Sequence, residues 1–182
     1  MLNANQCSFF KDMDKQLVTN NIYLIGMMGS GKTTVGRLLA EKLNYRFFDT
    51  DVAVEKLAQK TIAEIFATDG EAKFRLLETL TLKKASAEGK SAIATGGGIV
   101  QRSQNWNYLR QGLTIWLDVK LNLLHQRLAE DKTRPLIAQL EPLLKIRRSL
   151  YAQADFRIAI KPEQTPEDIV TEIINLHESI AS

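Results

Sequence analysis

The sequence predicts an α/β domain in three layers, with a doubly wound, five-stranded parallel sheet between two layers of helices. Short apolar runs alternate with segments of helical apolar spacing along most of the chain. A glycine-rich phosphate-binding motif follows the first run, an acidic turn follows the second, and three glycines follow the third. Because the carboxyl ends of parallel strands share one sheet edge, we expect these three turns to form a ligand site there.

The strands are expected at residues 22–25, 45–48, 91–95, 113–118 and 156–160. Helices are expected at residues 35–43, 52–59, 61–66, 69–89, 103–110, 121–130, 139–153 and from 165 to near the end. Two helix starts have clear signals. Thr61 and Glu64 form a capping box, and Thr165 precedes a proline and two acids. Right-handed crossovers between such strands give the doubly wound topology.

The length of 182 residues suits one domain, and we expect an N-terminal extension over residues 1–20 followed by a single domain over 21–182. The formal charge of +3 is too small to indicate nucleic-acid binding. No apolar run reaches the roughly 18 residues of a membrane span. The single cysteine allows no internal disulfide, and the first 20 residues lack a secretory signal. We therefore expect a cytoplasmic protein, monomeric, without membrane or nucleic-acid partners.

Residues 26–34 read G-x-x-x-x-G-K-T-T, which is the pattern of a P-loop. Its glycines allow successive backbone N–H groups to face an anion, and the following helix adds its positive end. Lys32 would reach the β- and γ-phosphates, and Thr33 would offer a hydroxyl to Mg²⁺. The motif stands between an apolar strand and a helix, as it should, and therefore predicts binding of a nucleoside triphosphate.

Asp49 and Asp51 follow the second strand. In an extended tip alternate residues share a face, so both carboxylates would point into the cleft, one toward Mg²⁺ and one toward an acceptor hydroxyl. Asp51 could instead cap the next helix. Asp118, at the end of the fourth strand, competes with Asp49 for the metal role, and we favour Asp49 because a second carboxylate stands beside it.

Residues 96–98 are three glycines, which indicates a ligand that approaches the backbone closely. Arg75 precedes Glu78 by three residues on one helical face, so Glu78 could hold its guanidinium. Arg147 lies toward the C-terminal end of the helix expected at residues 139–153, and Arg134 lies in a polar loop that could close over a phosphate and exclude water.

Six motifs in this order resemble the shikimate kinase family over roughly residues 20–178. They are Gly26-x-x-Gly29-Ser30-Gly31-Lys32-Thr33-Thr34-x-Gly36, Phe48-Asp49-Thr50-Asp51, Ile65-Phe66-Ala67-x-x-Gly70-Glu71-x-x-Phe74-Arg75-x-x-Glu78, Gly96-Gly97-Gly98, Arg134-Pro135-Leu136 and Arg147-x-x-x-Tyr151. The resemblance implies ATP-dependent phosphorylation of the shikimate 3-hydroxyl. It also implies a fold like the nucleoside monophosphate kinases, with strand order 2-3-1-4-5, substrate-binding helices at about 50–78 and a mobile lid at about 129–138.

The resemblance also implies roles for individual residues. Asp51 would bind the shikimate hydroxyls and act as base, Arg75 and Arg147 would hold the carboxylate, and Gly97 would donate from its backbone. Lys32 and Arg134 would stabilise the transferring phosphoryl group, while Thr33 and Asp49 would serve Mg²⁺. The ATP site would comprise Gly29, Ser30, Gly31, Lys32, Thr33, Thr34, Arg127, Arg134 and the residue at position 164. That position is Gln164 where many family members carry arginine, so its contact with adenine is an open point.

There are three alternatives to a shikimate kinase: another kinase, a nucleotide-dependent switch and a relative without activity. Another small-molecule kinase, for gluconate or a nucleoside monophosphate, would share the P-loop, although the paired aspartates and triple glycine disfavour it. A nucleotide-dependent switch would carry D-x-x-G and N-K-x-D, which are absent from the sequence. A non-catalytic relative would have lost Lys32, Asp51 or one of the two arginines that would hold the carboxylate, and all of these are present.

Overall fold

The computed structural model describes residues 20–129 and 140–181. Within them, five parallel strands form one sheet in the order β2-β3-β1-β4-β5. The strands are β1 (Ile22–Ile25), β2 (Arg46–Asp49), β3 (Ser91–Ala94), β4 (Leu113–Val119) and β5 (Phe156–Ile160). The predicted parallel sheet and its strand order are confirmed.

The helices cover both faces of this sheet. They are α2 (Lys32–Leu43), α3 (Thr50–Ala58), α4 (Ile62–Thr68), α5 (Gly70–Ser86), α6 (Ser103–Leu109), α7 (Leu121–Leu128), α8 (Leu140–Tyr151) and α9 (Pro166–Ala181), with a short 3₁₀ helix η1 (Ile99–Gln101). Most of the expected N-terminal extension and lid, including Arg134, lie outside the described residues. No helix in the described part of the chain is long and apolar enough to cross a membrane.

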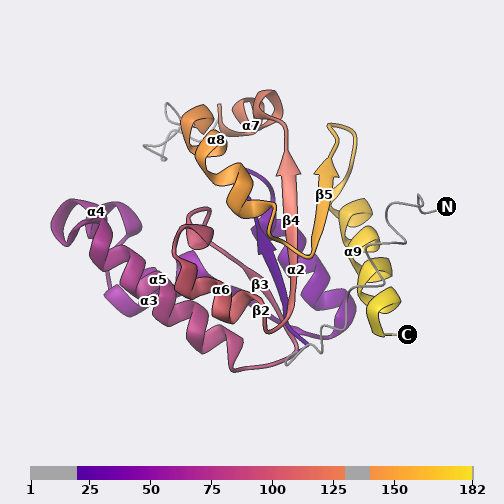
Figure 1. The fold of residues 1–182 in the computed structure, drawn as a ribbon, viewed down its shortest axis with the longest axis horizontal. Coiled ribbons are helices and arrows are strands. Elements are labelled where there is room, and N and C mark those ends of the chain that lie inside the picture. The colour runs from indigo at the N-terminus through magenta and orange to yellow at the C-terminus, as the bar shows by residue number, and fades with distance from the viewer. Residues whose placement is uncertain (1–19, 130–139, 182) are drawn as a thin grey trace.

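Topology decides which helix covers which face. The chain steps from β1 to β2 through α2 and then returns across the sheet through the remaining crossovers. Since such crossovers are right-handed, α2 lies on one face with α9, which packs against it, while α6 and α8 lie on the other (Figure 1). The three central strands β1, β3 and β4 are buried along their whole length, as expected for a parallel sheet covered twice.

Gly36 allows the P-loop helix to sit close to the sheet. A Cβ at this position would approach the Phe47 ring to 2.8 Å, so α2 can press against β2 only because the side chain is absent. At its other end, α2 stops at Asn44, whose left-handed backbone (φ 54°) turns the amide back onto Ala40 and Glu41. The chain then enters β2 directly.

The turn after β2 differs from the sequence-based expectation. Asp49 ends the strand and is itself the N-cap of α3, because its Oδ1 accepts from the amides of Asp51 (3.0 Å) and Val52 (3.4 Å). Asp51 therefore lies in the first helical turn and not in an extended tip, and it is not the cap. The prediction that strand alternation aims both carboxylates was wrong, although both of them line the same cavity.

Candidate functional site: a phosphate loop facing an arginine-lined glycine turn

The P-loop closes around the side chain of its own lysine. Lys32 is buried, and its Nζ donates to the carbonyls of Gly26 (2.9 Å) and Met27 (2.7 Å) and to Ser30 Oγ (3.3 Å). Gly29 and Gly31 have φ angles of 76° and 92°, a region that favours glycine. The loop thus holds a cation at the N-terminus of α2, where a phosphate would meet it.

A cavity of about 300 Å³ opens in front of this loop. Its lining includes Lys32, Thr33 and Thr34 from the P-loop helix, together with both aspartates and Gly97; the remaining lining residues are Met28, Gly29, Gly31, Thr95, Arg127 and Leu128. The turns after β1, β2 and β3 therefore meet at the carboxyl edge of the sheet, as predicted.

Thr33 and Asp49 offer oxygen ligands side by side in this cavity. Thr33 Oγ1 donates to Asp49 Oδ2 at 2.9 Å, and Asp49 is fixed from behind by the amides of α3. One hydroxyl and one carboxylate suit Mg²⁺, which usually keeps several waters and takes its other ligands from phosphates. In the part of the chain described, no cluster of three or more acidic, histidine or cysteine side chains forms a complete metal cage.

Asp118 is placed elsewhere. It is buried within β4, where its Oδ2 accepts from Arg157 Nε (2.8 Å) and Arg148 Nη2 (3.2 Å), and it does not line the cavity. The structure brings Asp49 and not Asp118 to the P-loop, which is the arrangement that the sequence analysis favoured.

The glycine turn after β3 lies among four charged side chains. A Cβ on Gly96 would come within 2.8 Å of both Asp51 Oδ1 and Glu78 Oε1, and one on Gly98 would overlap the Arg75 guanidinium. A side chain at Gly96 or Gly98 would therefore displace these charged groups from their present positions. Arg147 Nη1 would lie 3.5 Å from a Cβ on Gly97, so both predicted arginines flank the turn.

Glu78 holds Arg75, as the sequence predicted. The Arg75 Nη1 donates to Glu78 Oε2 (3.0 Å), and Nη2 donates to Glu71 Oε1 (3.1 Å). Burial raises the pKa of Glu78, an effect that Arg75 and Arg147 oppose and the nearby Asp51 charge reinforces. The two guanidinium groups thus offset part of the cost of burying a carboxylate whose exposed fraction is 1%.

Two contacts at this turn were not foreseen from the sequence. Tyr151 Oη donates to Gly97 O at 2.5 Å, and burial raises the pKa of Tyr151 to about 12, so the phenol stays protonated as a donor. Arg147 Nη2 donates to Gln101 Oε1 at 3.2 Å. A signal for the tyrosine was present: it follows Arg147 by four residues and therefore shares its helical face.

Of the two residues expected near the adenine, Arg127 and Gln164, only the first lines the cavity. Arg127 lines the cavity, and its Nη1 lies 3.4 Å from the Gly29 carbonyl. Gln164 does not line the cavity; its Oε1 accepts from the Lys161 amide (2.9 Å) and so closes the loop before α9.

This combination of fold and site defines a P-loop kinase that acts on a small molecule, because a phosphate cradle faces a compact pocket of carboxylates, arginines and backbone amides. A family model described as shikimate kinase matches residues 28–178. A shikimate kinase of Rippkaea orientalis is 54% identical over 160 residues, covering 85% of this chain and 86% of that protein. One of Microcystis aeruginosa is 52% identical, covering 85% and 84%. The chain belongs to the shikimate kinase family and is a phosphotransferase.

Solved structures agree. A shikimate kinase from Acinetobacter baumannii, determined in complex with shikimate, superposes with a TM-score of 0.83 at 37% identity and covers 90% of this chain and 95% of that one. A sugar kinase from Janibacter at 17% identity gives a TM-score of 0.58, covering 90% and 99%, and shows the shared fold alone.

Proposed function

We propose that the protein transfers the γ-phosphoryl group of ATP to the 3-hydroxyl of shikimate, giving shikimate 3-phosphate and ADP. The observation that supports this most directly is the convergence on one glycine turn of Asp51, Arg75 and Arg147, opposite a P-loop lysine. Shikimate has one carboxylate and three hydroxyls. Two arginine forks match the first, and a carboxylate with backbone amides matches the second.

In this proposal each group has one task. Arg75 and Arg147 bind the shikimate carboxylate, and the Gly97 amide and Asp51 bind its hydroxyls. As the 3-hydroxyl oxygen bonds to the γ-phosphorus, the bond from that phosphorus to the β–γ bridging oxygen breaks. Asp51 takes the hydroxyl proton, and ADP leaves. Lys32 neutralises charge that develops on the phosphoryl oxygens, assisted by Arg134 from the lid.

Thr33 and Asp49 would hold Mg²⁺, Asp49 through a water. When bound, the ion neutralises charge on the β- and γ-phosphates. Gly29, Ser30, Gly31 and Thr34 would complete the phosphate site, and Arg127 would lie near the adenine. We assign Gln164 to the same region through the loop that it closes. We also propose a cytoplasmic monomer, with residues 21–182 as the catalytic domain, residues 1–20 as an extension and about 129–138 as the lid.

Replacing Asp51 by asparagine tests the assignment. Asp51→Asn keeps the size and the hydrogen-bonding capacity but cannot accept the proton, so kcat with shikimate should fall at least about 100-fold. The affinity for ATP, measured by titration calorimetry, should stay within about threefold. The assay is coupled ADP release with ATP, Mg²⁺ and shikimate, run beside gluconate and nucleoside monophosphates. A wild-type kcat in the variant would exclude Asp51 as base, and faster turnover of another acceptor would exclude shikimate.

A further inference from the structure

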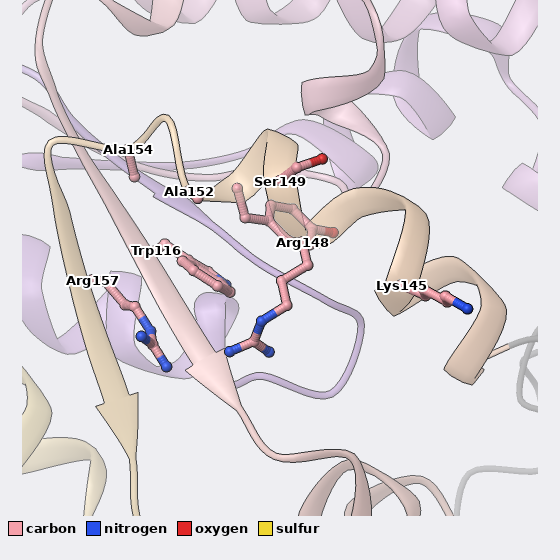
Figure 2. Close-up of a pocket in the computed structure, with 8 residues that line it drawn as sticks. Trp116, Lys145, Arg148, Ser149, Ala152, Ala154 and Arg157 are labelled. Carbon is pink, nitrogen blue, oxygen red and sulfur yellow. The ribbon is translucent and has the colours of Figure 1, made fainter.

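A second and larger hollow lies away from the P-loop, between α8 and the strands β4 and β5 (Figure 2). Its volume is about 510 Å³, and it is lined by Trp116, Lys145, Arg148, Ser149, Tyr151, Ala152, Ala154 and Arg157. Among these residues, Tyr151 reaches the glycine turn through its hydrogen bond to Gly97. The hydrogen bonds and ion pairs given above for the glycine turn involve none of the others. The hollow is therefore a separate feature of the fold.

The charge around this hollow is strongly unbalanced. Three cationic side chains line it: Lys145, Arg148 and Arg157. The buried carboxylate of Asp118 forms ion pairs with both arginines. Three positive charges and one negative charge leave this group of four side chains at +2. A buried carboxylate needs one close cation, and Arg157 alone contacts Asp118 through two nitrogens, so the fold places more positive charge here than Asp118 requires.

The two arginines are arranged around an aromatic ring. The Arg148 and Arg157 carbons Cζ lie 5.4 Å and 5.2 Å from the centroid of the Trp116 ring, which Figure 2 shows between them. Both side chains remain about half exposed, at 51% and 53%, so their outer N–H groups face the hollow and the solvent. The Trp116 indole itself is only 3% exposed, because the two guanidinium groups and Tyr151 cover it. The apolar surface beside these donors therefore comes from Ala152 and Ala154.

We propose that this hollow is a binding site for a small organic dianion with a flat apolar body. Guanidinium groups bind carboxylate or phosphate oxygens through paired N–H donors, and a stacked guanidinium is held in place for that contact. Lys145, one turn before Arg148 on α8, adds a charge at the far side of the hollow (Figure 2). The flat body would pack against Ala152, Ala154 and the half-exposed guanidinium groups that cover the indole, since a guanidinium plane also stacks on flat rings.

The site has a direct connection to the catalytic one. Trp116 stacks on Tyr151, with ring centroids 5.8 Å apart, and the Tyr151 hydroxyl reaches the carbonyl of Gly97. Arg148 also follows Arg147 in sequence on α8. A ligand that shifts Trp116 or the end of α8 would therefore move groups that border the glycine turn.

Binding of isophthalate to the full-length protein tests the proposal. The titration is done by calorimetry with ADP and shikimate at saturating concentrations, so that the catalytic site is filled. Isophthalate should bind, whereas neutral isophthalamide should not. Arg157→Gln should weaken binding about tenfold, because one charge-assisted pair is lost. Lys145→Gln should weaken it less, and added salt should weaken it in the wild type.

The controls separate a site from general attraction. Arg37→Gln removes an exposed arginine that lies 5.0 Å over the Phe47 ring, away from the hollow, and should leave isophthalate binding unchanged. Arg157→Gln leaves Asp118 paired with Arg148, and Lys145→Gln touches neither, so both variants should fold. The proposal is overturned by absence of binding, by equal loss in Arg37→Gln, by unchanged affinity in Arg157→Gln and Lys145→Gln, or by sulfate binding as tightly as isophthalate.

Discussion

At the scale of single residues, Glu78 is the most constrained group near the glycine turn. It is almost fully buried, which raises its pKa above the ordinary value of 4.5, while Arg75 and Arg147 oppose that shift. A raised pKa means that the folded protein holds the proton more tightly than the unfolded chain does. The contribution of Glu78 to stability is therefore greatest at low pH and declines as pH rises through its folded pKa.

Glu78→Gln should show this sign directly. The free energy of unfolding of the wild type, relative to the variant, should fall as pH rises from about 4 and level off above the folded pKa, as measured by urea denaturation. The KM for shikimate should rise about tenfold at neutral pH, because Arg75 loses its charged partner at 3.0 Å. Glu71→Gln is the matched control, since Glu71 pairs with the same guanidinium from the solvent side. A pH-independent difference between wild type and Glu78→Gln would refute the assignment.

At the scale of elements, the acceptor side depends on two helices that are far apart in the sequence. Helix α5 presents Arg75 and Glu78, and α8 presents Arg147 and Tyr151. The glycine turn lies between them, and Tyr151 ties it to α8 through the 2.5 Å bond to Gly97. The backbone N–H of Gly97 can be aimed at a substrate only if this turn is held, so Tyr151 acts as a positioning residue.

Tyr151→Phe should therefore raise the KM for shikimate about five- to tenfold, since a buried carbonyl loses its donor and the turn loosens. The kcat should change by less than about threefold, because the lost contact would affect ground state and transition state alike. Steady-state kinetics with each substrate varied in turn provide the measurement. Tyr45→Phe, on the far side beside His177, is the control and should behave as wild type. A large drop in kcat with unchanged KM would contradict the positioning role.

At the scale of the whole molecule, the sequence predicts what depends on local patterns and chain order. The parallel sheet and the meeting of three turns at one edge follow from alternating elements and right-handed crossovers, whereas the strand order was implied by the resemblance to the shikimate kinase family. Contacts between distant segments could not be predicted. Asp118 was a candidate metal ligand because it stands near the end of a strand. Its actual partners are arginines 30 and 39 residues further along the chain, and no local pattern links them to it. Asp51 was predicted in an extended strand tip but lies in the first turn of α3, because the helix begins two residues earlier with Asp49 as its cap. Either aspartate could cap this helix, and the sequence alone does not decide between them.

The catalytic unit should need only the chain from residue 20 onward. The main hydrophobic cluster of the described residues extends from Ile22 in β1 to Ile173 in α9, with partly buried side chains as far as Ile180 packed against it. Deletion of residues 1–19 should therefore leave kcat and both KM values within about twofold and shift Tm by only a few degrees. Deletion of residues 1–25 also removes β1, which pairs with both β3 and β4, and this control should not fold. Activity assays and thermal unfolding of the two truncated proteins make the measurement. A drop in kcat of tenfold or more in the shorter deletion would show that residues 1–19 contribute to the active site.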